Sequence, residues 1–332
     1  MKIAINGFGR IGRIFLRRIL TKPGIEVVAI NDLTDTATLA HLFKYDSVHR
    51  GFTGDVSFDD QHLIVNNNKI KILTERDPAK LPWKDLNIDL VVESTGKFTS
   101  RQGGEMHLAA GAKRVVISAP SADKDIPTLV LGVNDDKIDL TSNILSNASC
   151  TTNNVAAMVK ILDDNWGIVD GYITTVHSMT GDQSLHDAPH KDLRRARAAS
   201  ASIIPTTTGA AKAITSIFPH LTGKLGGAGI RVPVLNGSLT DFTCILKTQP
   251  TVQEINLAFK QAAHGDMKNI LEYTEDAIVS ADIVGNTHSC VFDAQLTSVV
   301  GDLTKVVGWY DNEMGYSSRL ADLVEKIHLL HD

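Results

Sequence analysis

The chain has 332 residues, of which 43% are hydrophobic, and its formal net charge is -5. This length predicts two domains, and the negative charge argues against nucleic acid or an anionic membrane as the main partner. Because no run of 18 apolar residues is present and three cysteines are too few for a disulfide framework, we expect a cytoplasmic protein without a membrane span. A strand that begins at residue 2 leaves no room for a signal peptide.

The first 32 residues combine a glycine-rich turn with two apolar runs. Residues 2–6 predict a buried parallel strand, and residues 7–12, which read GFGRIG, open a segment with helical spacing. The first glycine permits a tight turn, the second lets the backbone approach a pyrophosphate, and the third lets the helix pack on the strand. A second apolar run, 26–30, is followed by Asp32, which is placed to accept hydrogen bonds from ribose hydroxyls. The pattern predicts a dinucleotide site; the alternative is a surface turn with a solvated acid.

The rest of the first half predicts strands that alternate with helices. Strands are expected at 89–93 and 114–118, with a helix at 101–110 between them. Residues 56–73 contain short apolar runs, which we interpret as antiparallel additions to the sheet. Polar residues that follow strands are expected at the carboxyl edge, where ligands bind in open α/β sheets: Ser94, Thr95, Gly96 and Ser118.

The second half changes character. Its longer β segments, which predict a mainly antiparallel sheet, are residues 168–176, 238–247, 290–295 and 305–310. Helices are expected at 151–165, 210–217, 251–264 and 315–330, the third after a capping box. The predicted fold is α/β, with a Rossmann-type domain (1–149), an α+β catalytic domain (150–314) and a C-terminal helix (315–332) that packs on the first domain.

One cysteine lies where a nucleophile is expected. Cys150 is at the start of a predicted helix, where the helix dipole and free N–H groups favour the thiolate and can hold an oxyanion. Cys244 and Cys290 lie inside apolar strand patterns and are interpreted as buried core residues. His177 follows a strand and opens a polar loop, so it is a candidate base. The bland alternative is a third buried cysteine and an ordinary histidine.

The sequence ASCTTN at 148–153 resembles the active-site motif of phosphorylating glyceraldehyde-3-phosphate dehydrogenases. The resemblance extends over essentially the whole chain. Further motifs in the family's order are 6–13, 45–49, 118–120, 190–197, 205–213 and 309–313.

The resemblance implies a role for each matching residue. Cys150 would form a thiohemiacetal and then a thioester, and His177 would act as the base. The residues implied to bind the substrate and the attacking phosphate are Ser149, Thr151, Thr180, Arg195, Thr208, Gly209 and Arg231. The residues implied to bind NAD are Asn6, Gly7, Gly9, Arg10, Ile11, Gly12, Asp32, Arg76, Ser94, Thr95, Gly96, Ser118, Asn312 and Tyr316. No metal is implied, and the implied substrates are glyceraldehyde 3-phosphate and inorganic phosphate.

The basic run 191–197 has two interpretations. By itself it could mark a nucleic-acid surface, although no aromatic residues are interleaved. In the family this stretch packs against a neighbouring subunit near its cofactor, which implies a homotetramer. The chain departs from the usual family pattern at Met179, Ala188, Met314 and Asn154. We expect the enzyme to remain active with Asn154 at its position.

Three other functions stay open from the sequence. One is a hydrolytic dehydrogenase of the erythrose-4-phosphate type, which residues 206–209 disfavour because that segment would serve the attacking phosphate. The others are a semialdehyde dehydrogenase with a similar two-domain plan, and a non-catalytic RNA-binding or scaffold protein.

Overall fold

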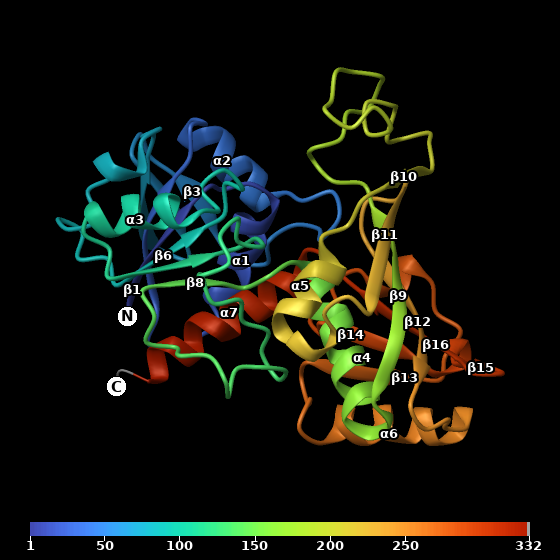
Figure 1. The fold of residues 1–332 in the computed structure, drawn as a ribbon. Helices are drawn as coiled ribbons and strands as arrows, with labels where there is room; N and C mark the ends of the chain where they lie inside the picture. Colours follow the sequence, from blue (N-terminus) through green and yellow to red (C-terminus); the bar gives the residue numbers. More distant parts are fainter. Residues whose placement is uncertain (331–332) are drawn as a thin grey trace. The chain divides into compact units, whose positions relative to one another are not determined.

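The computed structural model describes residues 1–330, which form two compact units (Figure 1). The first unit contains residues 1–129, 137–148 and 317–330; the second contains 130–136 and 149–316. The short segment Val130–Asp136 therefore groups with the second unit, although the sequence placed it inside the first domain.

The first unit is built on one eight-stranded sheet in the order β3-β4-β5-β2-β1-β6-β7-β8. Its strands are β1 (Lys2–Asn6), β2 (Glu26–Asn31), β3 (Val56–Phe58), β4 (His62–Val65), β5 (Asn68–Leu73), β6 (Leu90–Glu93), β7 (Arg114–Ile117) and β8 (Ile144–Ser146). Six neighbouring strands of this sheet are parallel and follow the Rossmann order: β5, β2, β1, β6, β7 and β8. This arrangement confirms the predicted fold class. Strands β3 and β4 are antiparallel additions, as predicted, but β5 pairs with β2 in parallel and completes the Rossmann order.

Helices of the first unit follow the strands of this sheet. They are α1 (Arg10–Ile19), α2 (Thr36–Lys44), the 3-10 turn η1 (Pro78–Lys80), α3 (Arg101–Ala109) and most of α7 (Met314–Leu329). The sequence did not predict α2, which begins where the Asp35 side chain accepts a hydrogen bond from the Thr38 N–H at 2.9 Å. Helix α7 is fixed to the rest of its unit by Lys22, whose Nζ lies 2.7 Å from both Asp322 and Glu325.

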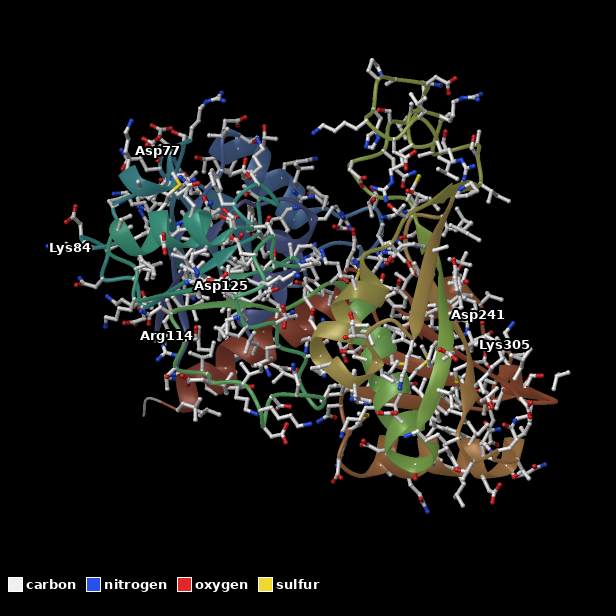
Figure 2. The ribbon with its side chains drawn as sticks, viewed as in Figure 1. Asp77, Lys84, Arg114, Asp125, Asp241 and Lys305 are labelled. Atoms are coloured by element: carbon white, nitrogen blue, oxygen red, sulfur yellow. The ribbon has the colours of Figure 1, made fainter. Side chains whose placement is uncertain are left out.

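The second unit has another eight-stranded sheet, in the order β10-β11-β9-β12-β16-β14-β13, with β15 paired to β16. The strands are β9 (Ile168–Ser178), β10 (Ile204–Thr206), β11 (Leu225–Val232), β12 (Ser238–Leu246), β13 (Leu271–Thr274), β14 (Cys290–Asp293), β15 (Ser298–Val300) and β16 (Leu303–Tyr310). Only the β11–β9 and β13–β14 pairs are parallel, so the prediction of a mainly antiparallel sheet is confirmed. Polar side chains tie its long strands together, as where Lys305 on β16 pairs with Asp241 on β12 at 2.8 Å (Figure 2).

The remaining elements cover this second sheet or connect its strands. They are α4 (Cys150–Trp166), α5 (Ala210–Ile217), η2 (Pro219–Leu221), α6 (Val252–His264), η3 (Ser280–Ile283) and η4 (Ala294–Leu296). Helix α4 is buried over most of its length and packs on β9, β12, β16 and α5. The predicted capping box is present at α6, where Thr251 and Glu254 exchange hydrogen bonds. Deep burial of α4 gives its first residues a fixed position.

Candidate active site

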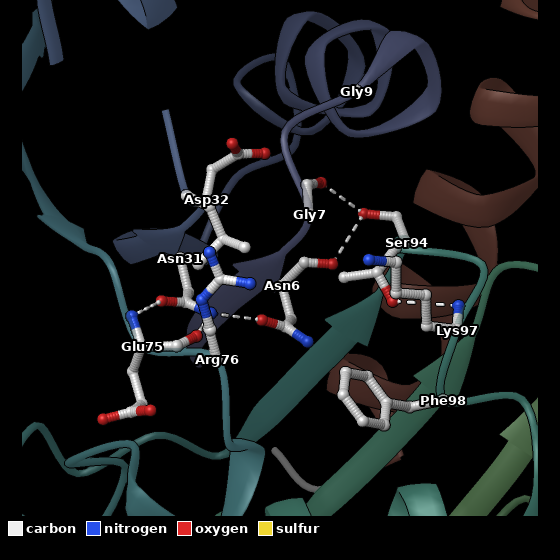
Figure 3. A pocket seen from close by; sticks show the side chains of 12 residues that line it. Asn6, Gly7, Gly9, Asn31, Asp32, Glu75, Arg76, Ser94, Lys97 and Phe98 are labelled. Carbon is white, nitrogen blue, oxygen red and sulfur yellow. Dashed lines mark hydrogen bonds between the residues drawn. The ribbon is translucent and has the colours of Figure 1, made fainter. Parts of the chain in front are cut away.

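A pocket of about 510 Å³ opens at the carboxyl ends of β1, β2 and β6 (Figure 3). It lies where the strand order of the first unit reverses, between β1 and its neighbours on either side. This is the place at which doubly wound sheets bind nucleotides. The residues that line it are Asn6, Gly7, Gly9, Asn31, Asp32, Leu33, Glu75, Arg76, Ser94, Thr95, Lys97 and Phe98.

The three glycines of the turn have distinct tasks. Gly7 has φ = +93°, and a Cβ there would lie 2.7 Å from the Thr95 nitrogen. A Cβ at Gly12 would lie 2.2 Å from the Gly7 oxygen, so this glycine permits close packing of α1 on the turn. A Cβ at Gly9 would meet nothing within 4 Å, and the residue lines the pocket. Gly9 therefore leaves room for a ligand to approach the backbone.

Asp32 is held in a fixed orientation at the end of β2. Its Oδ2 accepts from the Phe8 N–H at 2.8 Å, and its Oδ1 accepts from the Thr34 N–H at 3.0 Å. A carboxylate oxygen has more than one lone pair, so both oxygens can still accept hydrogen bonds from a ribose.

The pocket contains only part of the predicted cofactor set. Seven of the predicted residues line it: Asn6, Gly7, Gly9, Asp32, Arg76, Ser94 and Thr95. Those that do not line it are Arg10, Ile11, Gly12, Gly96, Ser118, Asn312 and Tyr316. Arg10 instead pairs with Asp46 at 2.5 Å. Asn312 belongs to the second unit, where its Oδ1 accepts from two serine hydroxyls.

Sequence reasoning missed five lining residues: Asn31, Leu33, Glu75, Lys97 and Phe98. Asn31 ends β2, and Leu33 follows it closely. Lys97 and Phe98 follow the polar triplet 94–96. Their position just beyond strand ends was the signal that could have found them, since that edge carries the ligands of such sheets.

The second unit places a thiol beside an imidazole. Cys150 is the first residue of α4, and Ser149 caps this helix by accepting from the Thr152 N–H at 3.1 Å. The Cys150 Sγ lies 3.5 Å from the Nε2 of His177. His177 is inside β9, near its end, whereas the sequence placed it just after that strand. The geometry is that of a nucleophile with its base.

Two groups compete for the other nitrogen of this imidazole. The Ser178 carbonyl lies 2.7 Å from His177 Nδ1 and can only accept, so it favours a proton on Nδ1. The Nε2 then presents a lone pair to the thiol. The Arg231 Nη1 lies 2.9 Å from the same Nδ1 and can only donate, so it favours the opposite tautomer with a proton on Nε2. In the first tautomer the imidazole can take up the thiol proton; in the second it can donate a hydrogen bond to the thiolate.

The ionisation of the pair differs from the sequence expectation. Burial raises the pKa of the Cys150 thiol, although the Arg231 charge and the Thr151 N–H act to lower it. The predicted lowering of this pKa by the helix start is therefore wrong for the free protein, because burial outweighs the local effect. Burial, with help from Arg231, also lowers the pKa of His177 to about 4. Near neutral pH the free pair is an uncharged thiol and an uncharged imidazole.

The other two cysteines fit their predicted structural role. Cys244 and Cys290 are 2% and 0% exposed, and all three cysteines are free. Burial raises the pKa of Cys244 to about 12 and that of Cys290 further still. Cys150 is partly exposed, so it is the cysteine that a reagent can reach.

Arg231 and Thr180 come together beside the thiol–imidazole pair, as the resemblance implied. The Arg231 Nη1 donates to Thr180 Oγ1 at 3.0 Å and to the Ser178 carbonyl at 3.1 Å. Arg195 forms a neighbouring group: its Nε donates to Thr206 Oγ1 at 2.9 Å and its Nη1 to Asp182 at 3.0 Å. Burial, and after it the charge of Arg195, lowers the pKa of Arg231, so the two guanidinium groups lie close enough to interact.

The predicted phosphate-binding hydroxyls stand at the starts of two packed helices. Ser149 and Thr151 are at the start of α4, and Thr208 and Gly209 immediately precede α5, which packs on α4. Sequence reasoning missed Tyr310, whose hydroxyl lies 2.8 Å from Thr151 Oγ1. That tyrosine is 1% exposed, and its aromatic type inside a predicted strand gave no sign of a polar contact.

All four residues that depart from the family pattern form hydrogen bonds in the structure. Asn154 is fully buried and donates to the Trp309 carbonyl at 3.2 Å. The other three use their main-chain N–H groups as donors within the second unit: Met179, Ala188 and Met314.

Over residues 1–330, no group of three or more His, Cys, Asp or Glu side chains is placed to hold a metal ion. In that same part of the chain, no helix has both the length and the apolar character needed to cross a membrane.

A Rossmann pocket in one unit and a thiol–imidazole pair in the other are the parts of a dehydrogenase that acts through a covalent thiol intermediate. Comparison with known proteins is more specific. The family models for the NAD binding domain and the C-terminal domain of glyceraldehyde 3-phosphate dehydrogenase match residues 1–101 and 149–312.

Curated relatives match almost end to end. The glyceraldehyde-3-phosphate dehydrogenase of Mycobacterium tuberculosis is 56% identical over 331 residues, which cover 98% of this chain and 97% of the relative. That of Streptomyces coelicolor is 55% identical over 327 residues, and these cover 97% of each chain. The chain belongs to the glyceraldehyde-3-phosphate dehydrogenase family, and NAD is its cofactor.

Proposed function

We propose that this chain oxidises glyceraldehyde 3-phosphate with NAD and inorganic phosphate to give 1,3-bisphosphoglycerate. The observation that carries the proposal is the Cys150 Sγ, which lies 3.5 Å from the Nε2 of His177 in a chain of this family. The twin arginines beside this pair suit a substrate that bears a phosphate.

The reaction divides into two halves at the thiol. The Cys150 sulfur attacks the aldehyde carbon while His177 Nε2 takes the thiol proton and passes it to the carbonyl oxygen, which completes the thiohemiacetal. NAD, when bound, supplies the hydride acceptor. Loss of hydride from the thiohemiacetal leaves a thioester on Cys150 and puts the hydroxyl proton on His177. Inorganic phosphate then attacks the thioester carbon and the C–S bond breaks. The acyl phosphate leaves, and the proton held by His177 returns to the sulfur and restores the thiol.

The pocket of the first unit suits NAD on chemical grounds. Gly7 and Gly9 bring the backbone close to a pyrophosphate, and Asp32 offers acceptors to a ribose while its charge repels a 2′-phosphate. We propose that the unit containing this pocket is the NAD-binding domain and that the unit containing Cys150 is the catalytic domain.

In the catalytic domain we propose two anion sites. Thr180 and Arg231, with Arg195 beside them, hold the substrate phosphate, because guanidinium groups and a hydroxyl suit a tetrahedral anion. The starts of α4 and α5 hold the attacking phosphate through their hydroxyls and N–H groups.

We also propose a cytoplasmic homotetramer. All three cysteines are free, which suits a reducing compartment. The loop between β9 and β10 exposes apolar side chains, Leu185 at 65% and Leu193 at 81%, which suits a partner subunit. Light scattering during gel filtration measures the mass; a monomer at micromolar concentration would contradict the tetramer.

One assay tests the activity directly. NADH formation from glyceraldehyde 3-phosphate should be rapid with inorganic phosphate and should stop after a burst without it. Steady turnover that is independent of phosphate would favour a hydrolytic aldehyde dehydrogenase instead.

A further inference from the structure

A chain of buried polar groups lies directly behind the NAD pocket. Trp83, His107 and Glu93 are 0%, 0% and 1% exposed, and none of the three lines the pocket. Trp83 Nε1 donates to His107 Nδ1 at 3.0 Å, and His107 Nε2 lies 3.2 Å from Glu93 Oε2. A buried carboxylate is costly unless it is fully hydrogen-bonded, so its presence here needs a reason.

Glu93 is surrounded by donors on both oxygens. Its Oε2 also accepts from Asn6 Nδ2 at 2.6 Å. Its Oε1 accepts from the Thr95 N–H at 2.8 Å and from the Thr95 hydroxyl. That hydroxyl also accepts from the Lys97 N–H at 3.1 Å, and its own proton remains available for donation to Glu93. Each carboxylate oxygen of Glu93 therefore accepts from at least one N–H donor.

Trp83 fixes the proton on the imidazole. An indole N–H can only donate, so His107 Nδ1 must accept and the ring proton stays on Nε2, facing Glu93. The imidazole therefore cannot switch tautomers without placing two N–H groups against each other.

The network reaches the pocket through both of Glu93's other partners. Asn6 and Thr95 line the pocket. Asn6 Oδ1 accepts from Asn31 Nδ2 at 2.7 Å, and Asn31 bonds the main chain of Glu75 at 2.8 and 2.9 Å. One buried carboxylate is thus connected to every strand end that forms the pocket wall.

We propose that Glu93 is a positioning residue for NAD, and that Trp83 and His107 set the proton arrangement that lets it act. The carboxylate holds Asn6 and Thr95 in their places before the cofactor arrives, so NAD binding does not have to order them. The inference rests on the assignment of this pocket to NAD.

Glu93→Gln is the direct test. Either orientation of the new amide puts its NH2 against an N–H donor, Thr95 on one side or His107 and Asn6 on the other, so those bonds cannot all be kept. We expect NAD to bind about ten-fold more weakly by calorimetry, which corresponds to about 1.4 kcal/mol. The KM for NAD should rise with it while kcat at saturating NAD stays close to its original value. Alkylation of Cys150 by iodoacetamide without NAD should not change.

Asp89→Asn is the matched control. Asp89 immediately precedes β6, whereas Glu93 ends that strand, and it too accepts two hydrogen bonds, from the Lys2 N–H and Lys113 Nζ, both at 2.7 Å. It does not line the NAD pocket, so NAD affinity should stay unchanged. If the unsubstituted protein fails to bind NAD, the assignment of this pocket to NAD is wrong. If it binds NAD and Glu93→Gln binds NAD equally well, only the positioning role of Glu93 is wrong.

The tautomer makes a sharper test. Adding Trp83→Phe to Glu93→Gln removes the indole donor, so the His107 proton can move to Nδ1 and Nε2 can accept from the amide. The double variant should regain part of the lost NAD affinity even though it loses a buried indole. A double variant that binds NAD no more tightly than Glu93→Gln would overturn the role of Trp83 and His107.

A measurement on the unsubstituted protein tests the proposal even if the variants fail to fold. The chain has three tryptophans, so 5-fluorotryptophan labelling gives three ¹⁹F signals. The signal of Trp83, assigned with Trp83→Phe, should shift when NAD is added but not when glyceraldehyde is added. A signal that saturating NAD leaves unmoved would overturn the connection between the network and the pocket.

Discussion

Arg231→Gln removes the fixed charge that lies closest to the thiol–imidazole pair. Its Nη1 lies 3.0 Å from Thr180 Oγ1 and 2.9 Å from His177 Nδ1, so the guanidinium is already held in place before substrate binds. A hydrogen bond to a charged group contributes about 1.5–3 kcal/mol. The variant should therefore lose about one to two decades of kcat/KM for glyceraldehyde 3-phosphate.

The same variant should be much less impaired with glyceraldehyde, which has no phosphate to bind. Its pH dependence should also change in a defined direction. The Arg231 charge lowers the pKa of both Cys150 and His177, so its loss raises both values. Deprotonation of the pair then needs higher pH, and the rising limb of kcat/KM for glyceraldehyde should move to higher pH.

Stopped-flow measurement of NADH with each aldehyde, over a range of pH, gives both quantities. Arg197→Gln is the control, because Arg197 is also an arginine of this unit but is exposed and pairs with Asp187 at 3.0 Å. It should leave both aldehydes unaffected. Equal losses for the two aldehydes in Arg231→Gln, with an unmoved pH profile, would refute the assignment of Arg231 to the substrate phosphate.

The remaining predictions concern the same reaction. Cys150→Ser should abolish activity and remove the site of fastest iodoacetamide labelling, which peptide mapping checks; His177→Asn should slow both labelling and turnover. Thr208→Val should preserve the NADH burst but weaken the response to inorganic phosphate, so an unaltered phosphate KM would count against its role. NAD should exceed NADP in kcat/KM because Asp32 repels the 2′-phosphate, and Asp32→Asn should narrow the difference.

Where the fold depends on local patterns, the sequence predicted it well. The glycine turn between two apolar runs predicted β1, α1 and β2 because strand, turn and helix each leave a short-range signature. The start of α6 was visible for the same reason, since a capping box spans only four residues.

The elements that the sequence analysis did not predict either have no short-range signature or have one that was overlooked. Strand β11 reads LGGAGIRV, and its three glycines lack β propensity; its pairing with β9 and β10 is what makes it a strand. The prediction of the site was incomplete for the same reason, because Arg231 lies on β11. Helix α2 did have a signal, the Asp35 cap, three residues after the acid that drew attention as a ribose ligand.

Two effects, one local and one that depends on the whole unit, act on the pKa of Cys150. The helix start is local and visible in the sequence, and it favours the thiolate; burial is a property of the whole unit, and it raises the pKa of the thiol. Because burial also keeps His177 uncharged near neutral pH, the free pair holds one proton that can move from sulfur to Nε2 without any exchange with solvent. The charge of Arg231 favours the thiolate but disfavours the imidazolium, so its two effects on that transfer oppose each other. A bound phosphate beside Arg231 would offset this charge. It would weaken the support for the thiolate and, at the same time, ease protonation of His177, so the proposed substrate would shift the balance of the pair toward a basic His177 when the aldehyde is present.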